Sequence, residues 1–419
     1  MKKTLTILAL MPLLTYAQIT DVLFLNEGYY NFDTQTQDQD PSLGVYSGED
    51  GTYSVVYDFE ETGFLSDGLI HNGIIYIAAD TKIILFSAVD YSYLDQIDLA
   101  GVRDLAVHDN LLIATRGEFM QSFDSYLHIY DLNNLSLVAA LPNNGIDGPE
   151  FASEDVKVIG QKAYICVSNS FSFGSFQSII GVYDFADDSY SQIDLGQDGV
   201  NPENLMINDD FIYAFCNHSY DKSSIARLDP QSLDFEIAYV ANNGGCALSA
   251  VIDEKIYYQE YTLNKIARFD LASFSVQDTL ENQAFYSIAQ DPQSGDIWAS
   301  STDYFSSGSA HLIDPDGNEM NSFEVGISCG NILFNELETV SLNEVDEYDL
   351  LVYPNPSLGA VTIEWIDFPA VMEVYGVEGK LISTKQVLSS RTELNLSSGV
   401  YLIRAIGETI SPIRRVIIE

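Results

Sequence analysis

The chain has 419 residues, of which 62 are acidic and 18 basic, and its formal net charge is −44. This length exceeds that of one average domain, and a hydrophobic content of 46% excludes an intrinsically disordered chain. The acidic excess argues against nucleic-acid binding, which needs lysine and arginine to meet phosphates. It suits a soluble protein in a salty exterior, or one that attracts a cationic ligand or divalent ions.

The first 17 residues have the pattern of a secretory signal peptide. Lys2 and Lys3 precede an apolar run over residues 5–14, and Thr15-Tyr16-Ala17 supplies a small-x-small cleavage site. No later stretch reaches the length of a membrane-spanning helix. We therefore expect an exported chain without a transmembrane segment. No cysteine lies near the cleavage site, which argues against a lipoprotein anchor.

A short pattern recurs along the chain: an apolar pair, then Asp, then Leu, Phe or Pro. It occurs at Asp131, Asp184, Asp229, Asp270 and Asp314, with degenerate copies at Ser47 and Ser87. The copies lie about 44 residues apart, which is the period of propeller blades. Each period holds four short alternating segments rich in Val, Ile, Leu and Tyr, which predict strands. We expect the Asp to cap the tight turn into the fourth strand.

The two ends of this region complement each other. The segment "DVLFLNEG" (residues 21–28) aligns with second strands of the repeat, so the first unit lacks its innermost strand. The segment "CGNILFN" (residues 329–335) aligns with first strands, but no second strand follows it. The sequence therefore predicts an all-β fold in which residues 18–337 form a seven-bladed β-propeller. The N- and C-terminal strands would close it within one blade.

Long loops are predicted on only one face, between second and third strands and between blades. They include residues 26–41, 116–126, 168–178, 217–224 and 301–309. Aromatic residues amid Ser, Asn and Gly are typical of a recognition surface. We therefore expect ligand binding on this long-loop face, although the aromatic residues could instead fold inward as small loop cores. The candidate residues are Tyr29, Tyr30, Phe32, Phe119, Phe123, Phe171, Phe173, Phe176, Tyr220, Tyr304 and Phe305.

The chain lacks the common catalytic motifs for hydrolases, nucleotides and zinc, so no catalytic residue can be named and an enzyme is not the first expectation. His218 and His311 flank long loops, but two isolated histidines are a weak metal signal. Residues 33–40, "DTQTQDQD", could offer oxygens to Ca²⁺, yet they lack the glycine and glutamate of an EF-hand. We expect no cofactor. Cys166, Cys216, Cys246 and Cys329 are expected to be buried free thiols, because their positions in the repeat do not favour disulfides.

A polar linker over residues 338–348 precedes a strand-rich tail over residues 349–419, which predicts a small β-sandwich. The tail contains Tyr353-Pro354-Asn355-Pro356, Gly359, Gly379-Lys380, Ser398-Gly399-Val400-Tyr401 and a basic-apolar end at residues 414–418. In these motifs it resembles the type A C-terminal sorting domain of type IX secretion in gliding Gram-negative bacteria. Gly376 departs from the Asp or Asn usual there. The resemblance implies engagement of the secretion machinery, export and removal of the tail, and a secreted or surface-attached protein.

The large region carries Asn26-Glu27-Gly28 and Asn201-Pro202-Glu203, and in these motifs it resembles YncE-like seven-bladed surface propellers. Some members of that group capture cobalamin and pass it to an outer-membrane transporter, so the resemblance implies a corrinoid ligand and such a partner. Those members are lipoproteins, whereas this chain has a sorting tail. Two other classes stay open: an adhesin or matrix protein that binds glycan or protein, and a propeller hydrolase or lyase.

Overall fold

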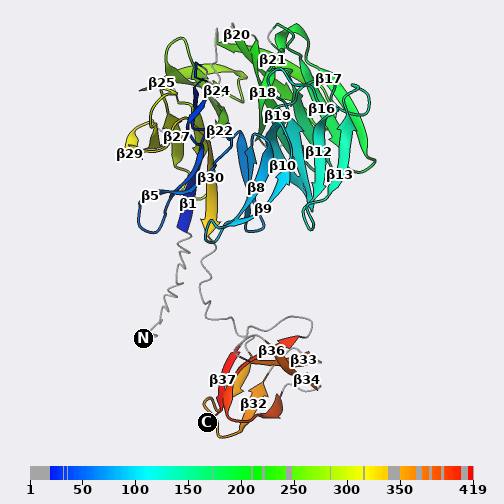
Figure 1. The fold of residues 1–419 in the computed structure, drawn as a ribbon, viewed down its shortest axis with the longest axis vertical. Coiled ribbons are helices and arrows are strands. Elements are labelled where there is room, and N and C mark those ends of the chain that lie inside the picture. The colour runs from blue at the N-terminus through cyan, green and yellow to red at the C-terminus, as the bar shows by residue number, and fades with distance from the viewer. Residues whose placement is uncertain are drawn as a thin grey trace, which may run out of the picture. The chain divides into compact units, whose positions relative to one another are not determined.

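The computed structural model describes residues 19–31, 33–34, 36–172, 174–208, 211–218, 222–241, 248–283, 285–314, 317–337, 350–364, 370–376, 380–387, 391–406 and 414–418. The predicted signal peptide and linker lie outside these residues. The chain divides into two compact units, Met1–Glu338 and Thr339–Glu419. The first unit is a β-propeller (Figure 1).

The described residues of the first unit form seven four-stranded antiparallel sheets, or blades. Blade 1 consists of β30 (Cys329–Leu337), β1 (Ile19–Asn26), β4 (Ser42–Tyr46) and β5 (Tyr53–Asp58). Blade 2 consists of β6 (Asp67–His71), β7 (Ile74–Ala79), β8 (Lys82–Ser87) and β9 (Tyr93–Asp98). Blade 3 consists of β10 (Val102–His108), β11 (Leu111–Arg116), β12 (Ser125–Asp131) and β13 (Leu137–Pro142). The hairpin β2 (Tyr29–Asn31) and β3 (Thr36–Gln39) lies between β1 and β4.

The remaining blades follow the same order from the first strand outward. Blade 4 consists of β14 (Val156–Ile159), β15 (Lys162–Val167), β16 (Ile179–Asp184) and β17 (Ser189–Asp194), and blade 5 of β18 (Pro202–Asn208), β19 (Phe211–His218), β20 (Lys222–Leu228) and β21 (Phe235–Ala241). Blade 6 consists of β22 (Ala250–Ile252), β23 (Lys255–Glu260), β24 (Lys265–Asp270) and β25 (Ser275–Gln283). Blade 7 consists of β26 (Ser287–Gln290), β27 (Ile297–Ser301), β28 (Ser309–Ile313) and β29 (Glu319–Glu324). A 3₁₀ turn, Gly196–Asp198, lies between β17 and β18.

The predicted closure is confirmed. β30 pairs antiparallel with β1, with Phe334 opposite Val22 and Ile332 opposite Phe24. Figure 1 shows the two strands side by side, although one begins and the other ends the unit. The seven first strands contact one another in the order β30, β6, β10, β14, β18, β22 and β26, and β26 contacts β30 again. The ring is therefore continuous and leaves no first strand with a free edge toward a missing neighbour.

The core lies between the blades, because alternate side chains of each strand point to opposite faces of its sheet. In β7, Ile75 and Ile77 pack against blade 1, whereas Tyr76 and Ala78 pack against blade 3. Each fully buried side chain of this kind contributes about 1.5–3 kcal/mol to folding. Because both faces of an inner strand such as β7 are covered, that strand is a nearly continuous apolar run, whereas outer strands such as β9 are largely exposed.

The recurring aspartates cap turns as predicted. The Asp131 carboxylate accepts a hydrogen bond from the Asn133 amide at 2.7 Å, and Asp229 accepts one from the Gln231 amide at 2.7 Å. In the degenerate copy at Ser87 the hydroxyl accepts from the Val89 amide at 3.2 Å. These hydrogen bonds shape the tight turns.

Cys166, Cys216 and Cys329 are buried free thiols, which confirms the prediction for these three. Cys166 and Cys216 belong to one apolar cluster between blades 4 and 5. Burial raises the pKa of Cys216 to about 12, so its thiol stays protonated at neutral pH. Cys246 lies outside the described residues.

The second unit is a sandwich of two small sheets around its own core. Leu350, Val361, Met372, Ile403 and Val416 are buried in that core. Its sheets are β31 (Leu351–Tyr353), β32 (Ala360–Glu364) and β35 (Arg391–Asn395), and β34 (Leu381–Val387), β33 (Ala370–Gly376), β36 (Gly399–Ile406) and β37 (Arg414–Ile418). In the described part of the chain, no helix has the length and apolar character needed to cross a membrane.

Candidate functional site

Every blade has a polar residue at one equivalent position, either within its first strand or immediately before it. In chain order the segments read "DGLI", "DLAV", "DVKV", "NLMI", "SAVI", "SIAQ" and "NILF". We call the seven residues at this position the polar ring. Its members are Asp67, Asp104, Asp155, Asn204, Ser249, Ser287 and Asn331.

Six of the seven ring residues join their blade to the next. Asp67 accepts a hydrogen bond from the Leu105 amide at 2.9 Å, and Asp155 accepts one from the Leu205 amide at 2.7 Å. Asn331 donates to Asp67 at 2.7 Å and so links blade 1 to blade 2. These bonds satisfy buried backbone amides that no sheet partner reaches, so much of the ring has a structural role.

Asp104 and Asn204 repeat this arrangement. The Asp104 carboxylate accepts from the Val156 amide at 3.2 Å, and the Asn204 side-chain oxygen accepts from the Ser249 amide at 3.0 Å. In blade 7 the Ser287 hydroxyl donates to the Cys329 carbonyl at 2.9 Å.

Ser249 is the exception in the ring. Its residue is 8% exposed, and its hydroxyl oxygen has no hydrogen-bond partner among the residues that the structure describes. The first strands of the blades surround a central channel. The Ser249 side chain lines a cavity at the end of this channel where the first strands begin. A buried hydroxyl without a partner is uncommon in proteins, and it marks a place where a bound molecule would gain a hydrogen bond.

Carboxylates crowd the blade 2–4 side of the ring around a single ammonium group. Lys157 Nζ lies 2.5 Å from an Asp155 oxygen and 3.8 Å from an Asp104 oxygen. Burial raises the pKa of Asp67 to about 6 despite the attraction of Lys157. Burial and repulsion from Asp155 and Asp67 hold the pKa of Asp104 well above its usual range. One lysine therefore does not neutralise the three acids fully.

Glu27 directly follows β1 and lies at the same end of the channel as the Ser249 cavity. The Tyr286 hydroxyl donates to its two carboxylate oxygens at 3.0 and 3.1 Å. A Cβ at residue 330 would collide with the Glu27 carboxylate, which explains the glycine in "CGNILFN". Gly28 has a φ of +76°, which lets the chain turn sharply after Glu27. Burial raises the pKa of Glu27 to about 7, although Tyr286 and Arg103 oppose the shift.

Arg103 lies between two aromatic rings at this mouth. Its guanidinium carbon is 5.2 Å from the centroid of Phe64 and 4.9 Å from that of Phe171. Its Nε is 3.0 Å from a carboxylate oxygen of Glu154, which also accepts a hydrogen bond from the Ser170 hydroxyl. Stacking and the ion pair together hold Arg103 in place.

These groups enclose a cavity of about 600 Å³. Its wall combines ring residues, the Arg103–Glu154 pair and loop residues from the long-loop face, including Phe119, Ser170 and Phe171. We call this cavity the channel mouth. It therefore opens on the face that the sequence favoured. No cluster of three or more His, Cys, Asp or Glu side chains suitable for a metal ion occurs within the described ranges.

Of the eleven predicted aromatic residues, the structure brings Phe119 and Phe171 into the wall of the channel mouth. Phe119 is 54% exposed, whereas Phe171 packs under Arg103. Phe123 does not line the cavity: it packs against Tyr126, and its centroid lies 3.9 Å from the Arg116 guanidinium. Phe171 and Phe123 thus follow the inward-folded alternative, stacked against arginines.

The loops of blades 1 and 7 meet through aromatic contacts beside the mouth. The ring centroids of Tyr29 and Phe305 are 5.7 Å apart, and those of Tyr286 and Tyr304 are 5.4 Å apart. Tyr30 is exposed at the β2–β3 hairpin, and Phe176 is half-buried. Phe32, Phe173 and Tyr220 lie outside the described residues.

The histidines and the acidic loop have local partners. His218 shares a hydrogen bond with the Ser224 hydroxyl at 2.9 Å, and His311 shares one with Glu319 at 2.7 Å. In the segment proposed to offer oxygens to Ca²⁺, Asp38 accepts from Asn31 at 2.8 Å and from Thr36 at 2.7 Å.

Motif-based reasoning missed the polar ring, although one signal was present in the repeat. Aligning the seven first strands would have placed a polar residue at the same offset before each tight turn. In the sequence, Asn26-Glu27-Gly28 and Asn201-Pro202-Glu203 stand out only as motifs of a resemblance. Glu203 lines the channel mouth, and Glu27 bonds to Tyr286 in its wall.

Comparisons with known proteins bear on each unit separately. The secretion system C-terminal sorting domain family matches residues 351–419. This domain indicates type IX secretion to the cell surface or the exterior, and it implies engagement of the secretion machinery. A search of the curated proteins finds no match.

Two solved structures show the fold of the rest. One is the extracellular domain of a protein assigned as a one-component system of B. thetaiotaomicron, with a TM-score of 0.51 and 11% identity over 96% of this chain. This chain spans 57% of that structure's length. The other is a hypothetical selenium-binding protein from Sulfolobus tokodaii, with a TM-score of 0.57 and 7% identity, over 76% of this chain and 93% of that one. Both likenesses support the β-propeller fold alone, and the sorting domain by itself supports a secreted or cell-surface protein.

Proposed function

We propose that this protein is an exported, non-enzymatic binding protein that takes a small ligand at the channel mouth. The observation that carries the proposal is the cavity of about 600 Å³ into which Ser249 directs a buried hydroxyl without a partner among the described residues. Aromatic walls beside a few convergent polar groups are typical of small-molecule sites. The surplus of carboxylates over Lys157 and Arg103 favours a ligand that donates hydrogen bonds or carries positive charge.

Among such ligands we propose a corrinoid first, in keeping with the resemblance to YncE-like surface propellers. Glu27 and Glu203, the acids of the two motifs behind that resemblance, both belong to the mouth or its wall. The carboxamides around a corrin ring would donate to carboxylates, and the broad ring would cover aromatic side chains such as Phe119. On this proposal, a transporter of the outer membrane would receive the ligand.

Titration of the full exported protein with cobalamin by calorimetry tests the specific ligand. We expect saturable one-to-one binding that weakens by about tenfold in Phe119→Ala, which removes an exposed ring from the mouth. Phe305→Ala is the matched control, because Phe305 lies on the same face but outside the cavity wall. Absence of both heat and thermal stabilisation would remove the corrinoid. Equal loss in the two variants would argue against the channel mouth.

A second candidate is a hydrolase or lyase. An enzyme of this fold would need polar groups that converge at the channel mouth, and the lining of that cavity contains such groups. Glu27, with a pKa near 7 beside Arg103, is the group best suited to general acid–base work. Turnover that Glu27→Gln abolishes, with binding retained, would favour this candidate over simple capture.

A further inference from the structure

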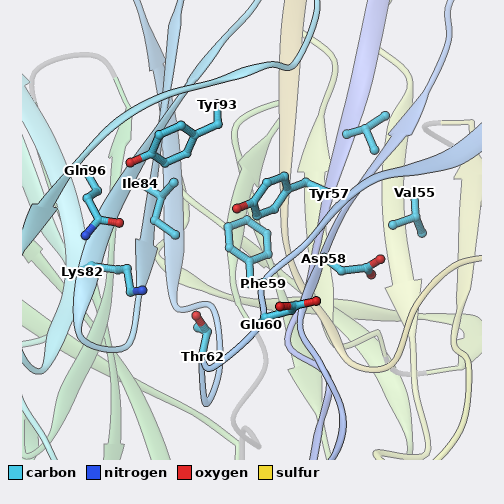
Figure 2. Close-up of a pocket in the computed structure, with 11 residues that line it drawn as sticks. Val55, Tyr57, Asp58, Phe59, Glu60, Thr62, Lys82, Ile84, Tyr93 and Gln96 are labelled. Carbon is cyan, nitrogen blue, oxygen red and sulfur yellow. The ribbon is translucent and has the colours of Figure 1, made fainter.

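A second cavity, of about 490 Å³, lies far from the polar ring, between the outer strands of blades 1 and 2. Its lining comes from β5, from the link between β5 and β6, and from β8 and β9. Figure 2 shows side chains converging on it from both blades. We call this cavity the outer groove.

The floor of the outer groove is aromatic: Tyr57 and Phe59 line it, and Phe86 packs against both without lining the cavity. Phe59 and Phe86 are almost fully buried, and the ring of Tyr57 packs edge-on against them with centroid distances of 4.9 and 4.8 Å. Tyr93, at the rim, packs edge-on against Phe86 and is 47% exposed. Most of the exposed Tyr93 ring is therefore available for a ligand to pack against.

Two polar side chains of the groove, Thr62 and Lys82, lack partners among the described residues, whereas the Gln96 amide donates to Asp98. Thr62 is 3% exposed, and its hydroxyl oxygen has no hydrogen-bond partner in the described part of the chain. The ammonium of Lys82 forms no ion pair with any described residue, although Asp58 and Glu60 line the same cavity. In Figure 2 the Lys82 nitrogen and the Thr62 hydroxyl point toward the same space, and the Tyr57 hydroxyl also points into the cavity.

A groove between blades 5 and 6 provides the contrast. It too is lined by a lysine and two tyrosines. There, Lys222 donates to the Tyr239 hydroxyl at 3.1 Å and lies over the Tyr239 ring, 4.6 Å from its centroid. The Tyr258 hydroxyl donates to the Val240 carbonyl at 2.9 Å. The lysine and tyrosines of that groove are thus paired within the protein, whereas those of the outer groove are open to a ligand.

We propose that the outer groove is a saccharide-binding site that takes one sugar ring of a glycan. A sugar presents hydroxyls that both donate and accept, which suits an ammonium, two carboxylates and two hydroxyls around one cavity. Its C–H face would pack on the exposed ring of Tyr93, and the buried Thr62 hydroxyl would gain its missing hydrogen bond. An extended peptide on the free edge of β5 is the competing occupant. The open groups favour a sugar, because they belong to side chains and not to the β5 backbone.

The experiment uses the full exported protein and defined oligosaccharides of neutral hexoses, N-acetylhexosamines and uronates as probes. Saturation-transfer NMR detects binding, and calorimetry measures it. We expect at least one class to bind, and Thr62→Val and Lys82→Met each to weaken it by about tenfold, the value of one good hydrogen bond. Lys222→Met, in the contrasting groove, should leave the affinity unchanged.

Thermal unfolding separates a lost contact from a lost fold. Thr62→Val keeps the shape of the side chain and removes an unpaired buried hydroxyl, so the variant should be at least as stable as the parent. Lys82→Met supplies a second test at a side chain that makes no ion pair with any residue the structure describes. Phe119→Ala, at the channel mouth, should not change saccharide binding. The test of the outer groove is therefore independent of the test of the proposed function.

Three results would overturn the proposal. No probe class binds the parent protein; a probe binds but ignores both Thr62→Val and Lys82→Met; or a β-strand peptide, and no saccharide, binds and is blocked by changes at Val55 and Val56 on β5.

Discussion

The Tyr286 hydroxyl donates to both carboxylate oxygens of Glu27, at 3.0 and 3.1 Å, across 259 residues of sequence. The contact joins the start of blade 7 to the end of β1 in blade 1. It therefore links blade 7 to blade 1, the blade in which the two ends of the propeller pair. Tyr286 also lines the channel mouth, so this contact connects the blade 7–blade 1 interface to the candidate site.

Replacing Glu27 by Gln should make the stability of the protein less dependent on pH. Burial raises the pKa of Glu27 from 4.5 to about 7, so the folded state holds the proton more tightly than the unfolded state. The stability linked to this group is thus fully present below pH 4.5 and is lost as pH rises through 7. At pH 8 we expect Glu27→Gln to be about 1–3 kcal/mol more stable than the parent, and near equal at pH 4.5.

Denaturant unfolding of parent and variant at both pH values measures this difference. Other acids with raised pKa values, such as Asp67, contribute equally to both proteins and cancel in the comparison. A constant difference across the two pH values would show that Glu27 titrates normally in the folded protein.

Replacing Lys157 by Met should destabilise the protein most at high pH. The variant leaves the Asp104 and Asp155 carboxylates without their nearest cation, and an uncompensated partly buried charge is costly. Because Lys157 is about one-third exposed, we expect a loss of about 1–3 kcal/mol at pH 8. The loss should shrink toward pH 5, since Asp67 and Asp104, with their raised pKa values, take up protons there.

Urea unfolding at pH 5 and pH 8 provides the measurement, with Lys82→Met as the matched control because Lys82 makes no ion pair among the described residues. A pH-independent loss for Lys157→Met would point to packing of its aliphatic stem and not to charge.

Cys166 and Cys216 should not react with a thiol reagent until the protein unfolds. Both are 0% exposed, and burial raises their pKa values, so the reactive thiolate is scarce and inaccessible. Labelling with an aromatic disulfide in a Cys246→Ser background should be negligible in native buffer and complete in guanidinium. Rapid native labelling at either site would contradict the packing between blades 4 and 5.

Much of the fold could be predicted from the sequence, because the blade period and the strand alternation are local signals. The "CGNILFN" segment even revealed the closure, since its missing second strand had a counterpart at the other end of the chain. The site was harder to predict. Composition predicts which loops carry aromatic residues, but whether a ring such as Phe123 faces a cavity or stacks on Arg116 depends on contacts between loops.

The polar ring was also hard to predict from the sequence, because it depends on contacts between blades. Each residue, such as Asp67, looks like an ordinary strand-end aspartate in its own segment. Its bond to the Leu105 amide exists only because blade 3 lies beside blade 2. Spacing within one repeat cannot reveal a contact between repeats, although aligning all seven would have revealed the shared position.

The closing strand supplies the last prediction. Residues 329–337 provide the first strand of blade 1. Within them, Asn331 bonds to Asp67 at 2.7 Å and Asn335 donates to the Ala88 carbonyl at 2.6 Å. A chain that starts at residue 18 and ends at residue 328 would leave one edge of β1 unpaired and expose core side chains such as Leu23. We expect that chain to aggregate or to unfold without a cooperative transition.

The matched chain ends at residue 337, lacks the sorting domain equally and differs only by the closing strand. It should stay soluble and unfold in one cooperative step, at the temperature of the propeller transition of the full protein, because the two units have separate cores. Circular dichroism during heating, together with sedimentation, compares the two. A soluble, cooperative chain ending at 328 would show that seven blades hold without the strand that joins their ends, and that the Asn331 and Asn335 bonds add little to the ring.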